Sequence, residues 1–191
     1  MNKTKLRLSL LLLGSIALGS CSRSGGNEFT AEGTITDAAG KTLYLETTDT
    51  DEPQLIDSVT LDEKGRFRFR REAHSYPAFY RLRLGESFIP FAADSVTHLT
   101  LSASGKDLFS TYKIESGDEA NKQIREIGQL RTATDKAIEA ILTQLNNGTL
   151  DRGIALARID SLSTQLKNTL TSKYIFSDPK GAAAYYALFQ S

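Results

Sequence analysis

The stretch ESGDEANKQ, residues 115–123, is where the hydrophobic pattern of this chain changes its period. Before it, apolar residues recur at every second position, as in RFRFR (66–70), where two phenylalanines share one face and three arginines the other. After it, Ile124, Ile127 and Leu130 begin a spacing of three and four residues. Alternation buries one face of a strand, whereas the longer spacing buries one stripe of a helix. Strands followed by helices predict an α+β protein.

The segment 28–116 is predicted to form an antiparallel β-sandwich or barrel-like domain. Polar turns such as DAAGK (37–41) and DEKG (62–65) separate short alternating runs about every ten residues, a spacing typical of these folds. We expect the turn at 37–41 to close a hairpin. The expected strands include residues 29–36, 43–45, 59–61, 66–70, 80–84, 88–92, 96–102 and 109–115.

Residues 117–191 are predicted to form a helical region. Ser116 and Glu119 have the spacing of a capping box at the start of its first helix. Helical spacing continues to NNG (146–148), where Gly148 suits the C′ position. A second helix is expected from Thr149 to Tyr174, and the short connection makes the two an antiparallel hairpin.

The last expected helix, KGAAAYYALFQ (180–190), is apolar on almost every side. Asp178 and Pro179 before it have the pattern of a helix cap and a first-turn proline. Because a helix that is apolar all round is normally buried, it needs a neighbour. We predict that the chain is a shortened version of a longer ancestor, or that this helix docks on another chain, through a protein partner or self-association. Packing of the helix on the preceding hairpin is the alternative.

The only cysteine of the chain, Cys21, follows a segment with the features of an export signal. Three basic residues precede an apolar run over residues 8–18, which is too short to cross a membrane, since crossing takes roughly 20 apolar residues. The sequence LGSC (18–21) resembles a bacterial lipobox. The resemblance implies a signal peptide over 1–20 and a lipid attached to Cys21, at the start of a tether over 21–27. An ordinary signal peptide followed by a free cysteine is the alternative.

A lipid anchor would make the membrane a partner and place the protein in the cell envelope. No acidic cluster follows Cys21, which favours the periplasmic face of the outer membrane over the cell surface. The chain has 23 basic and 23 acidic residues, and removal of the signal peptide leaves 20 against 23. Without a basic surplus to neutralise phosphates, nucleic acid is not an expected partner. A single cysteine also excludes a disulfide within the chain.

No motif in the sequence predicts a catalytic residue, a cofactor or a metal. GKT (40–42) lacks the first glycine of a phosphate-binding loop, because Ile35 stands at that place. DTDE (49–52) lacks the glycine and the glutamate that an EF-hand loop needs further on. His74 and His98, expected in a loop and a strand, have no second ligand at metal spacing. The three arginines of RFRFR are interpreted as a solvated sheet face rather than an anion site.

Four runs of sequence resemble a domain of uncharacterised function found in anchored periplasmic proteins: LIDSVTLDEKGRFRFR (55–70), PAFYRLRL (77–84), PFAADSVTHLTL (90–101) and YKIESGDEANKQI (112–124). In that family the domain precedes the thioredoxin-like domain of TlpA-like thiol–disulfide oxidoreductases, and the similarity extends over roughly residues 27–190. The redox chemistry which the family implies depends on a Cys-x-x-Cys pair. This chain has no such pair, so the redox role transfers to none of its residues.

Two functions of different classes stay open. The favoured one is a non-catalytic accessory or scaffold lipoprotein of the envelope, which is not an enzyme. The second is the N-terminal part of a thiol–disulfide oxidoreductase whose redox domain is missing or lies on another chain. An envelope lipoprotein that binds a ligand is a weaker alternative, since the chain has no tryptophan to serve as a stacking platform.

Overall fold

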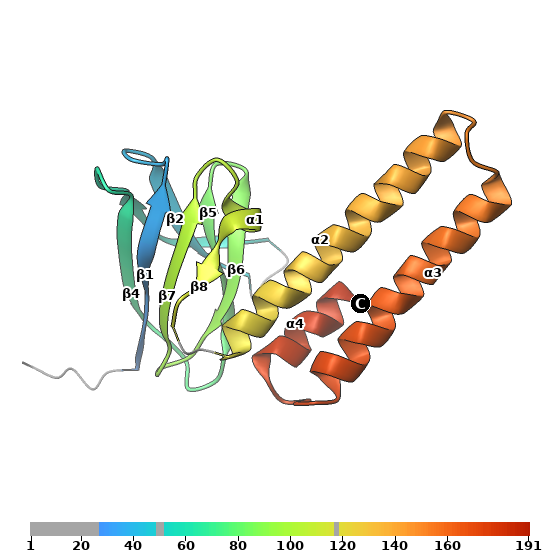
Figure 1. Cartoon of the computed structure of the whole chain (residues 1–191). Helices are drawn as coiled ribbons and strands as arrows, with labels where there is room; N and C mark the ends of the chain where they lie inside the picture. The colour runs from blue at the N-terminus through green and yellow to red at the C-terminus, as the bar shows by residue number, and fades with distance from the viewer. Residues whose placement is uncertain (1–26, 49–51, 117–118) are drawn as a thin grey trace, which may run out of the picture.

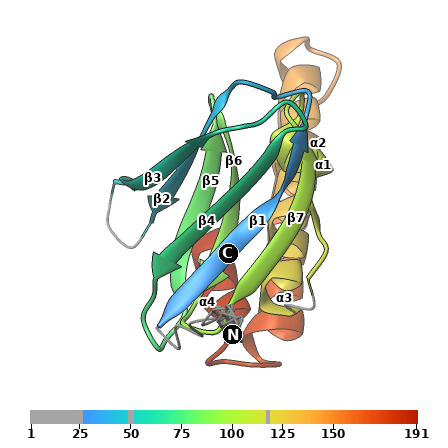
Figure 2. The same ribbon diagram turned by 90° about the vertical axis from the view of Figure 1, so that its left-hand side faces the viewer.

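Two four-stranded sheets face each other and are followed by helices in the computed structural model, which describes residues 27–48, 52–116 and 119–191 (Figure 1). The first sheet has the order β4-β1-β7-β8 and the second β3-β2-β5-β6; Figure 2 shows them as two layers. The predicted α+β class is confirmed. The strands are β1 (Glu28–Thr36), β2 (Thr42–Thr47), β3 (Gln54–Thr60), β4 (Arg66–Glu72), β5 (Ala78–Leu84), β6 (Ser87–Ala93), β7 (His98–Ser104) and β8 (Lys113–Ile114).

The core of the sandwich consists of the alternate residues that both sheets turn inward. Phe67 and Phe69 of β4 are buried as their alternation predicts, while the arginines beside them face outward. The ring of Phe29 on β1 lies between the sheets, with its centroid 4.7 Å from that of Tyr80 and 6.1 Å from that of Phe91. Burial of such side chains stabilises each by about 1.5–3 kcal/mol, so packing holds the sandwich together.

The predicted hairpin at residues 37–41 is wrong, because this turn joins strands of different sheets. β1 pairs with β4 and β7 in one sheet, whereas β2 pairs with β3 and β5 in the other. The turn at 62–65 likewise carries the chain from β3 in the second sheet to β4 in the first. Gly65 allows this crossing: its φ is +73°, and an added Cβ would lie 2.0 Å from the carbonyl oxygen of Ile35.

Two further details of the β domain differ from the prediction. β1 and β7 run parallel, so the domain is not wholly antiparallel. The expected strand at 109–115 is a short helix, α1 (Leu108–Thr111), followed by the two-residue strand β8. The side chain of Asp107 caps α1 by accepting a hydrogen bond from the amide of Ser110. The cap stabilises a helical turn here, and this local preference is stronger than the strand preference that the weak apolar alternation of the segment indicates.

The predicted helical hairpin is formed by α2 (Glu119–Asn146) and α3 (Arg152–Leu170), which run as two long adjacent helices in Figure 1. Gly148 has a φ of +69° at the C-terminal end of α2, as its C′ assignment predicts. The second helix begins later than expected, because Asp151 caps it through hydrogen bonds to the amides of Gly153 and Ile154. After α3 the chain continues as one turn of π-helix, η1 (Thr171–Ile175).

Two predicted helix caps are absent. Ser116 Oγ is buried and makes no hydrogen bond to any described residue, so no capping box forms there. The last helix, α4 (Ala182–Gln190), has Gly181 at its N-cap position instead of the predicted Asp178-Pro179 pair. Among the described residues, no helix is both long and apolar enough to cross a membrane.

α4 packs on the helical hairpin with one face only. Ala183 and Ala187 are buried in a cluster with Ile127 of α2, Leu170 of α3 and Tyr174 of η1. The larger apolar side chains on the other side of α4, Tyr185, Leu188 and Phe189, are exposed. The alternative, packing on the hairpin, is therefore what the alanine face shows, while contact of the exposed face with another chain stays a prediction.

Candidate functional site

α2 is fixed to the outer edge of the second sheet by one buried amide. Asn121 Oδ1 accepts a hydrogen bond from the backbone N–H of Ala92 at 2.8 Å, and its Nδ2 donates to the carbonyl of Ala92 at 2.8 Å. Ala92 lies on β6, the edge strand, so the side chain takes the place that a further strand would occupy. Ile124 of α2 and Ala182 of α4 pack on Ala92 below this contact.

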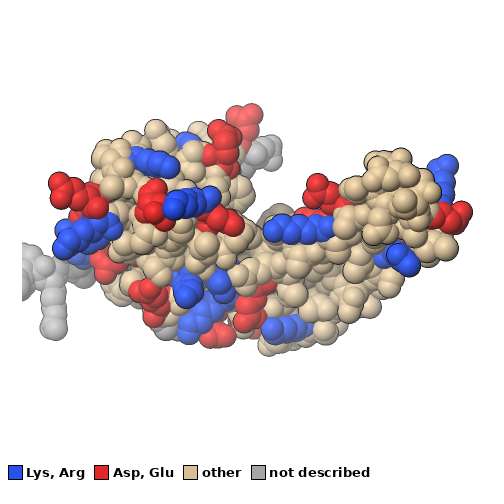
Figure 3. Space-filling model, turned by 45° about the horizontal axis from the view of Figure 1, so that its top comes forward, with Lys and Arg blue, Asp and Glu red and all other residues tan. Residues whose placement is uncertain are grey.

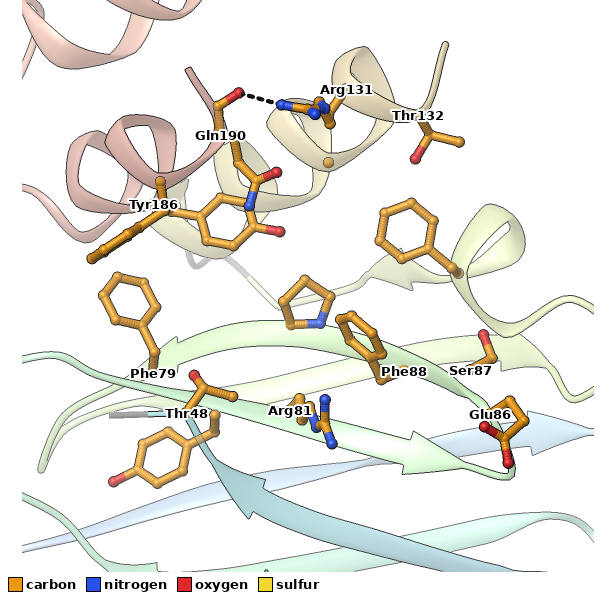
Figure 4. A pocket seen from close by; sticks show the side chains of 15 residues that line it. Thr48, Phe79, Arg81, Glu86, Ser87, Phe88, Arg131, Thr132, Tyr186 and Gln190 are labelled. Atoms are coloured by element: carbon orange, nitrogen blue, oxygen red, sulfur yellow. Dashed lines mark hydrogen bonds between the residues drawn. The ribbon is translucent and has the colours of Figure 1, made fainter. Parts of the chain in front are cut away.

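Beyond this contact, the helices and the outer face of the second sheet enclose a groove of about 690 Å³. Its volume falls within the roughly 300–1,000 Å³ typical of ligand sites. One wall comes from β5 and β6, and the other from α1, α2 and α4 (Figure 4). The groove is lined by Thr48, Phe79, Tyr80, Arg81, Glu86, Ser87, Phe88, Pro90, Phe109, Gly128, Arg131, Thr132, Tyr186, Phe189 and Gln190.

Gly128 of α2 makes room for the rings on the helical wall. A Cβ at this position would lie 2.8 Å from Phe109 Cζ and 3.8 Å from Tyr186 Oη. The ring of Tyr186 lies 6.3 Å from that of Phe79 across the groove, measured between centroids. Burial raises the pKa of Tyr186 to about 12, so its hydroxyl is a neutral hydrogen-bond donor at physiological pH.

The sheet wall contains a guanidinium group held by a buried carboxylate on the neighbouring strand. Glu46 of β2 is 5% exposed and accepts hydrogen bonds from Arg81 Nε at 2.6 Å and Arg83 Nε at 2.7 Å. Burial raises the pKa of Glu46, but the two arginines outweigh this effect and the pKa is lowered overall. One carboxylate thus neutralises only one of two arginines. Arg81 also lies over the ring of Phe88, 5.1 Å from its centroid.

The helical wall contains a second arginine, which links α2 to the end of α4. Arg131 Nε donates to the Asp135 carboxylate at 3.0 Å, and Nη1 donates to the backbone carbonyl of Gln190 at 3.0 Å (Figure 4). A cation at a helix C-terminus satisfies a free carbonyl and interacts favourably with the helix dipole. Arg131 therefore holds α4 in the position that shapes the groove.

The residues discussed from sequence lie away from this groove. His74 is in a loop, where its ring stacks on Tyr76 at 4.8 Å, and His98 begins β7, as predicted. Across 27–48, 52–116 and 119–191, no three metal-ligating side chains gather. GKT (40–42) lies at the turn before β2, and most of DTDE (49–52) lies outside the described residues. Cys21, the signal peptide (1–20) and the tether up to residue 26 lie outside them as well.

The arginine-rich strand β4 is a solvated face, as interpreted from its alternation. Arg66, Arg68 and Arg70 pair with Asp62, Glu32 and Glu28, respectively, with all six side chains substantially exposed. On the face of the molecule that Figure 3 shows, basic and acidic side chains are interspersed without a large field of one sign. Exposed pairs of this kind contribute about 0–1 kcal/mol each.

Sequence reasoning missed every residue of the groove. Its lining comes from segments between residues 48 and 190 that contact one another only in the folded chain. Two weak signals were present: a glycine inside a helical pattern at 128, and two arginines on the polar side of the alternating run at 78–84. A glycine inside a helix costs about 1 kcal/mol and usually has a packing reason.

The chain was compared with known proteins, and no curated protein matches it. A family model matches residues 29–123, a segment that extends from β1 to the first residues of α2. It includes the strand wall of the groove and Asn121, but ends before Gly128, Arg131 and α4. Over residues 29–123 the chain is therefore similar to the family described as Domain of unknown function (DUF4369).

Proposed function

We propose that this protein is a lipid-anchored, non-catalytic accessory module of the cell envelope, on the periplasmic face of the outer membrane, which binds through its groove. The observation that carries the proposal is the composition of the groove. Phe79, Phe88, Phe109, Tyr186 and Phe189 all line it, together with a proline. A concave apolar site with a few polar groups is the general form of a binding site.

The polar groups of the groove support binding rather than bond making. Arg81 and Arg131 are held in ion pairs, and the raised pKa of Tyr186 keeps its hydroxyl protonated. General acid–base catalysis needs a group that titrates near the working pH, and nucleophilic catalysis needs a nucleophile within reach of a base. Glu86, the acid of the lining, has neither a histidine nor a cysteine beside it in that lining.

The anchoring part of the proposal is supported by sequence. The apolar run over residues 8–18 and the LGSC sequence at 18–21 have the order that lipid attachment requires. Two or more acyl chains, each worth about 0.8 kcal/mol per buried CH₂, hold a protein stably on a membrane, whereas one chain does not. The described fold begins only a few residues after Cys21, so the sandwich would lie close to the bilayer.

Anchoring is tested with the Cys21→Ala variant expressed in a Gram-negative host fed an alkyne-labelled fatty acid. The wild type should incorporate label and sediment with the outer membrane. Cys21→Ala should lose the label and leave the membrane fraction, whereas the matched variant Ser22→Ala should behave as the wild type. If Cys21→Ala still sediments with membranes and keeps the mass of the wild-type product, the anchoring proposal is wrong.

The non-catalytic part is tested by insulin reduction, with a thioredoxin as positive control. Dithiol chemistry needs an attacking and a resolving thiol, and the chain has one cysteine. We expect no turnover above background. Turnover above background that survives alkylation of Cys21 would contradict the proposal, because it would be catalysis that does not use the thiol of this chain.

A further inference from the structure

We propose that the groove binds an amphiphile with one long apolar chain and a carboxylate head group, the chemistry of a free long-chain fatty acid. This inference rests on the proposed binding role of the groove and names the ligand. Three features carry it: the ring-lined walls, the net positive charge of Arg81, Glu46 and Arg83 taken together, and the exposed rings at the mouth.

The walls of the groove fit an apolar chain. Phe79 on the strand side lies opposite Tyr186 on the helix side (Figure 4). Pro90 of β6 and Phe109 of α1 also line the groove, so both walls carry apolar side chains. Each CH₂ moved from water to such a surface contributes about 0.8 kcal/mol. Gly128 leaves room for the ring of Phe109 in the helical wall, because any side chain at position 128 would collide with that ring.

The mouth of the groove exposes aromatic surface that a ligand chain would cover. Phe88 is 40% exposed on the strand side, and Phe189 is 79% exposed on the helix side. Leu188 extends this apolar surface along α4. Single exposed apolar side chains are common, whereas exposed rings on both sides of one groove form a contiguous apolar patch, and such patches mark binding sites.

The charge of the lining favours a carboxylate head group. Glu46 is shared by Arg81 and Arg83, so this trio has a net charge of one positive unit on the outer face of the sheet, beside the groove. Arg81 donates to Glu46 through Nε and also lines the groove. Hydrogen bonds between a guanidinium and a carboxylate are charge-assisted and roughly twice as strong as neutral ones.

The remaining charges of the lining set the position of the head group. Glu86, in the turn between β5 and β6, would repel a carboxylate at that end of the groove (Figure 4). Arg131 on the helix wall is paired with Asp135, so Arg81 on the strand wall is the cation that a carboxylate would meet. The head group therefore lies at Arg81, and the apolar chain lies along the rings.

The test uses the full-length protein in isolated outer membranes. The probe is a long-chain fatty acid with a diazirine on its chain and a terminal alkyne, added without ATP or coenzyme A so that it cannot be esterified. After irradiation, the labelled peptides are identified by mass spectrometry. We expect labelling of β6, α2 and α4, and competition by oleate about tenfold stronger than by oleyl alcohol, which lacks the charged head group.

Two matched pairs of variants separate binding from folding. Phe88→Ala should reduce labelling several-fold, whereas Phe176→Ala, which removes a more exposed ring outside the groove, should not. Arg81→Gln should weaken competition by oleate about tenfold. Arg83→Gln removes the other arginine of the Glu46 trio, which does not line the groove, and should have a smaller effect.

The inference is overturned if β6, α2 and α4 stay unlabelled, as expected if a second copy or a partner polypeptide fills the groove. It is also overturned if the two phenylalanine variants behave alike, or if oleyl alcohol competes as well as oleate. These outcomes do not depend on anchoring through Cys21. Failed labelling of a membrane-bound wild type refutes the ligand alone, whereas a wild type without a lipid refutes the proposed function.

Discussion

Replacement of Asn121 by alanine tests how the helical region is joined to the sandwich. In the wild type this side chain makes both hydrogen bonds that the outer edge of β6 offers at Ala92, each at 2.8 Å. Asn121 is 2% exposed and Ala92 is 4% exposed, so water does not reach the two backbone groups. Asn121→Ala leaves a buried donor and a buried acceptor without these partners.

The expected loss follows from the two backbone groups. A buried polar group without a partner costs about 1–3 kcal/mol, and relaxation of the edge strand lowers the total. We therefore expect Asn121→Ala to reduce the free energy of unfolding by about 2–4 kcal/mol. In a protein of this size, 1 kcal/mol corresponds to roughly 2–4 °C in Tm, so Tm should fall by about 5–15 °C.

The assay is urea-induced unfolding of the full chain in mild detergent, followed by circular dichroism and by hydrogen exchange at the amide of Ala92. Asn168→Ala, an exposed position on α3, is the matched control and should change stability by less than about 0.7 kcal/mol. The reasoning is refuted if Asn121→Ala lowers the free energy of unfolding no more than Asn168→Ala does and the backbone amide of Ala92 stays as protected as in the wild type. The side chain of Asn121 would then not hold the helices on the sheet.

Two further predictions concern the sandwich itself. The lowered pKa of Glu46 means that its ion pairs stabilise the fold above its ordinary pKa of 4.5 and that this contribution is lost as the pH falls below that value. Glu46→Gln should therefore flatten the acid side of a stability–pH curve measured by urea unfolding; an unchanged acid slope would contradict this. Gly65→Ala should destabilise by more than 2 kcal/mol, roughly the penalty of a left-handed φ plus the contact with Ile35. Gly40→Ala, with a φ of +74° and no atom near its added Cβ, should cost only about 1–2 kcal/mol, and equal losses in thermal unfolding would refute the steric argument.

Local patterns in the sequence determined the class of the fold. The alternation at 66–70 placed Phe67 and Phe69 in the core, and the glycine at 148 ended α2 where its C′ assignment predicted. Such features depend on neighbours within a few residues, because the strand and helix periods and the cap conformations are local properties of the backbone. The lipid attachment at Cys21 stays a prediction, since that residue lies outside the described part of the chain.

The pairing of the strands was decided by tertiary structure. Alternation shows that one face of a strand is buried, but it does not show which strand lies beside it. The turn at 37–41 has the composition of a hairpin turn and yet connects two sheets. The segment 109–115 reads as a strand, but the side chain of Asp107 caps a helical turn there.

The candidate site was decided by tertiary structure alone. Asn121 is a polar residue within an amphipathic helix, which from sequence suggests a solvent-facing position, but it is buried because Ala92, 29 residues earlier, offers it two hydrogen bonds. The groove joins β5 and β6 to residues of α4 about 100 positions later. Sequence periodicity is insensitive to contacts over such separations, because they depend on which faces pack together once the elements have formed.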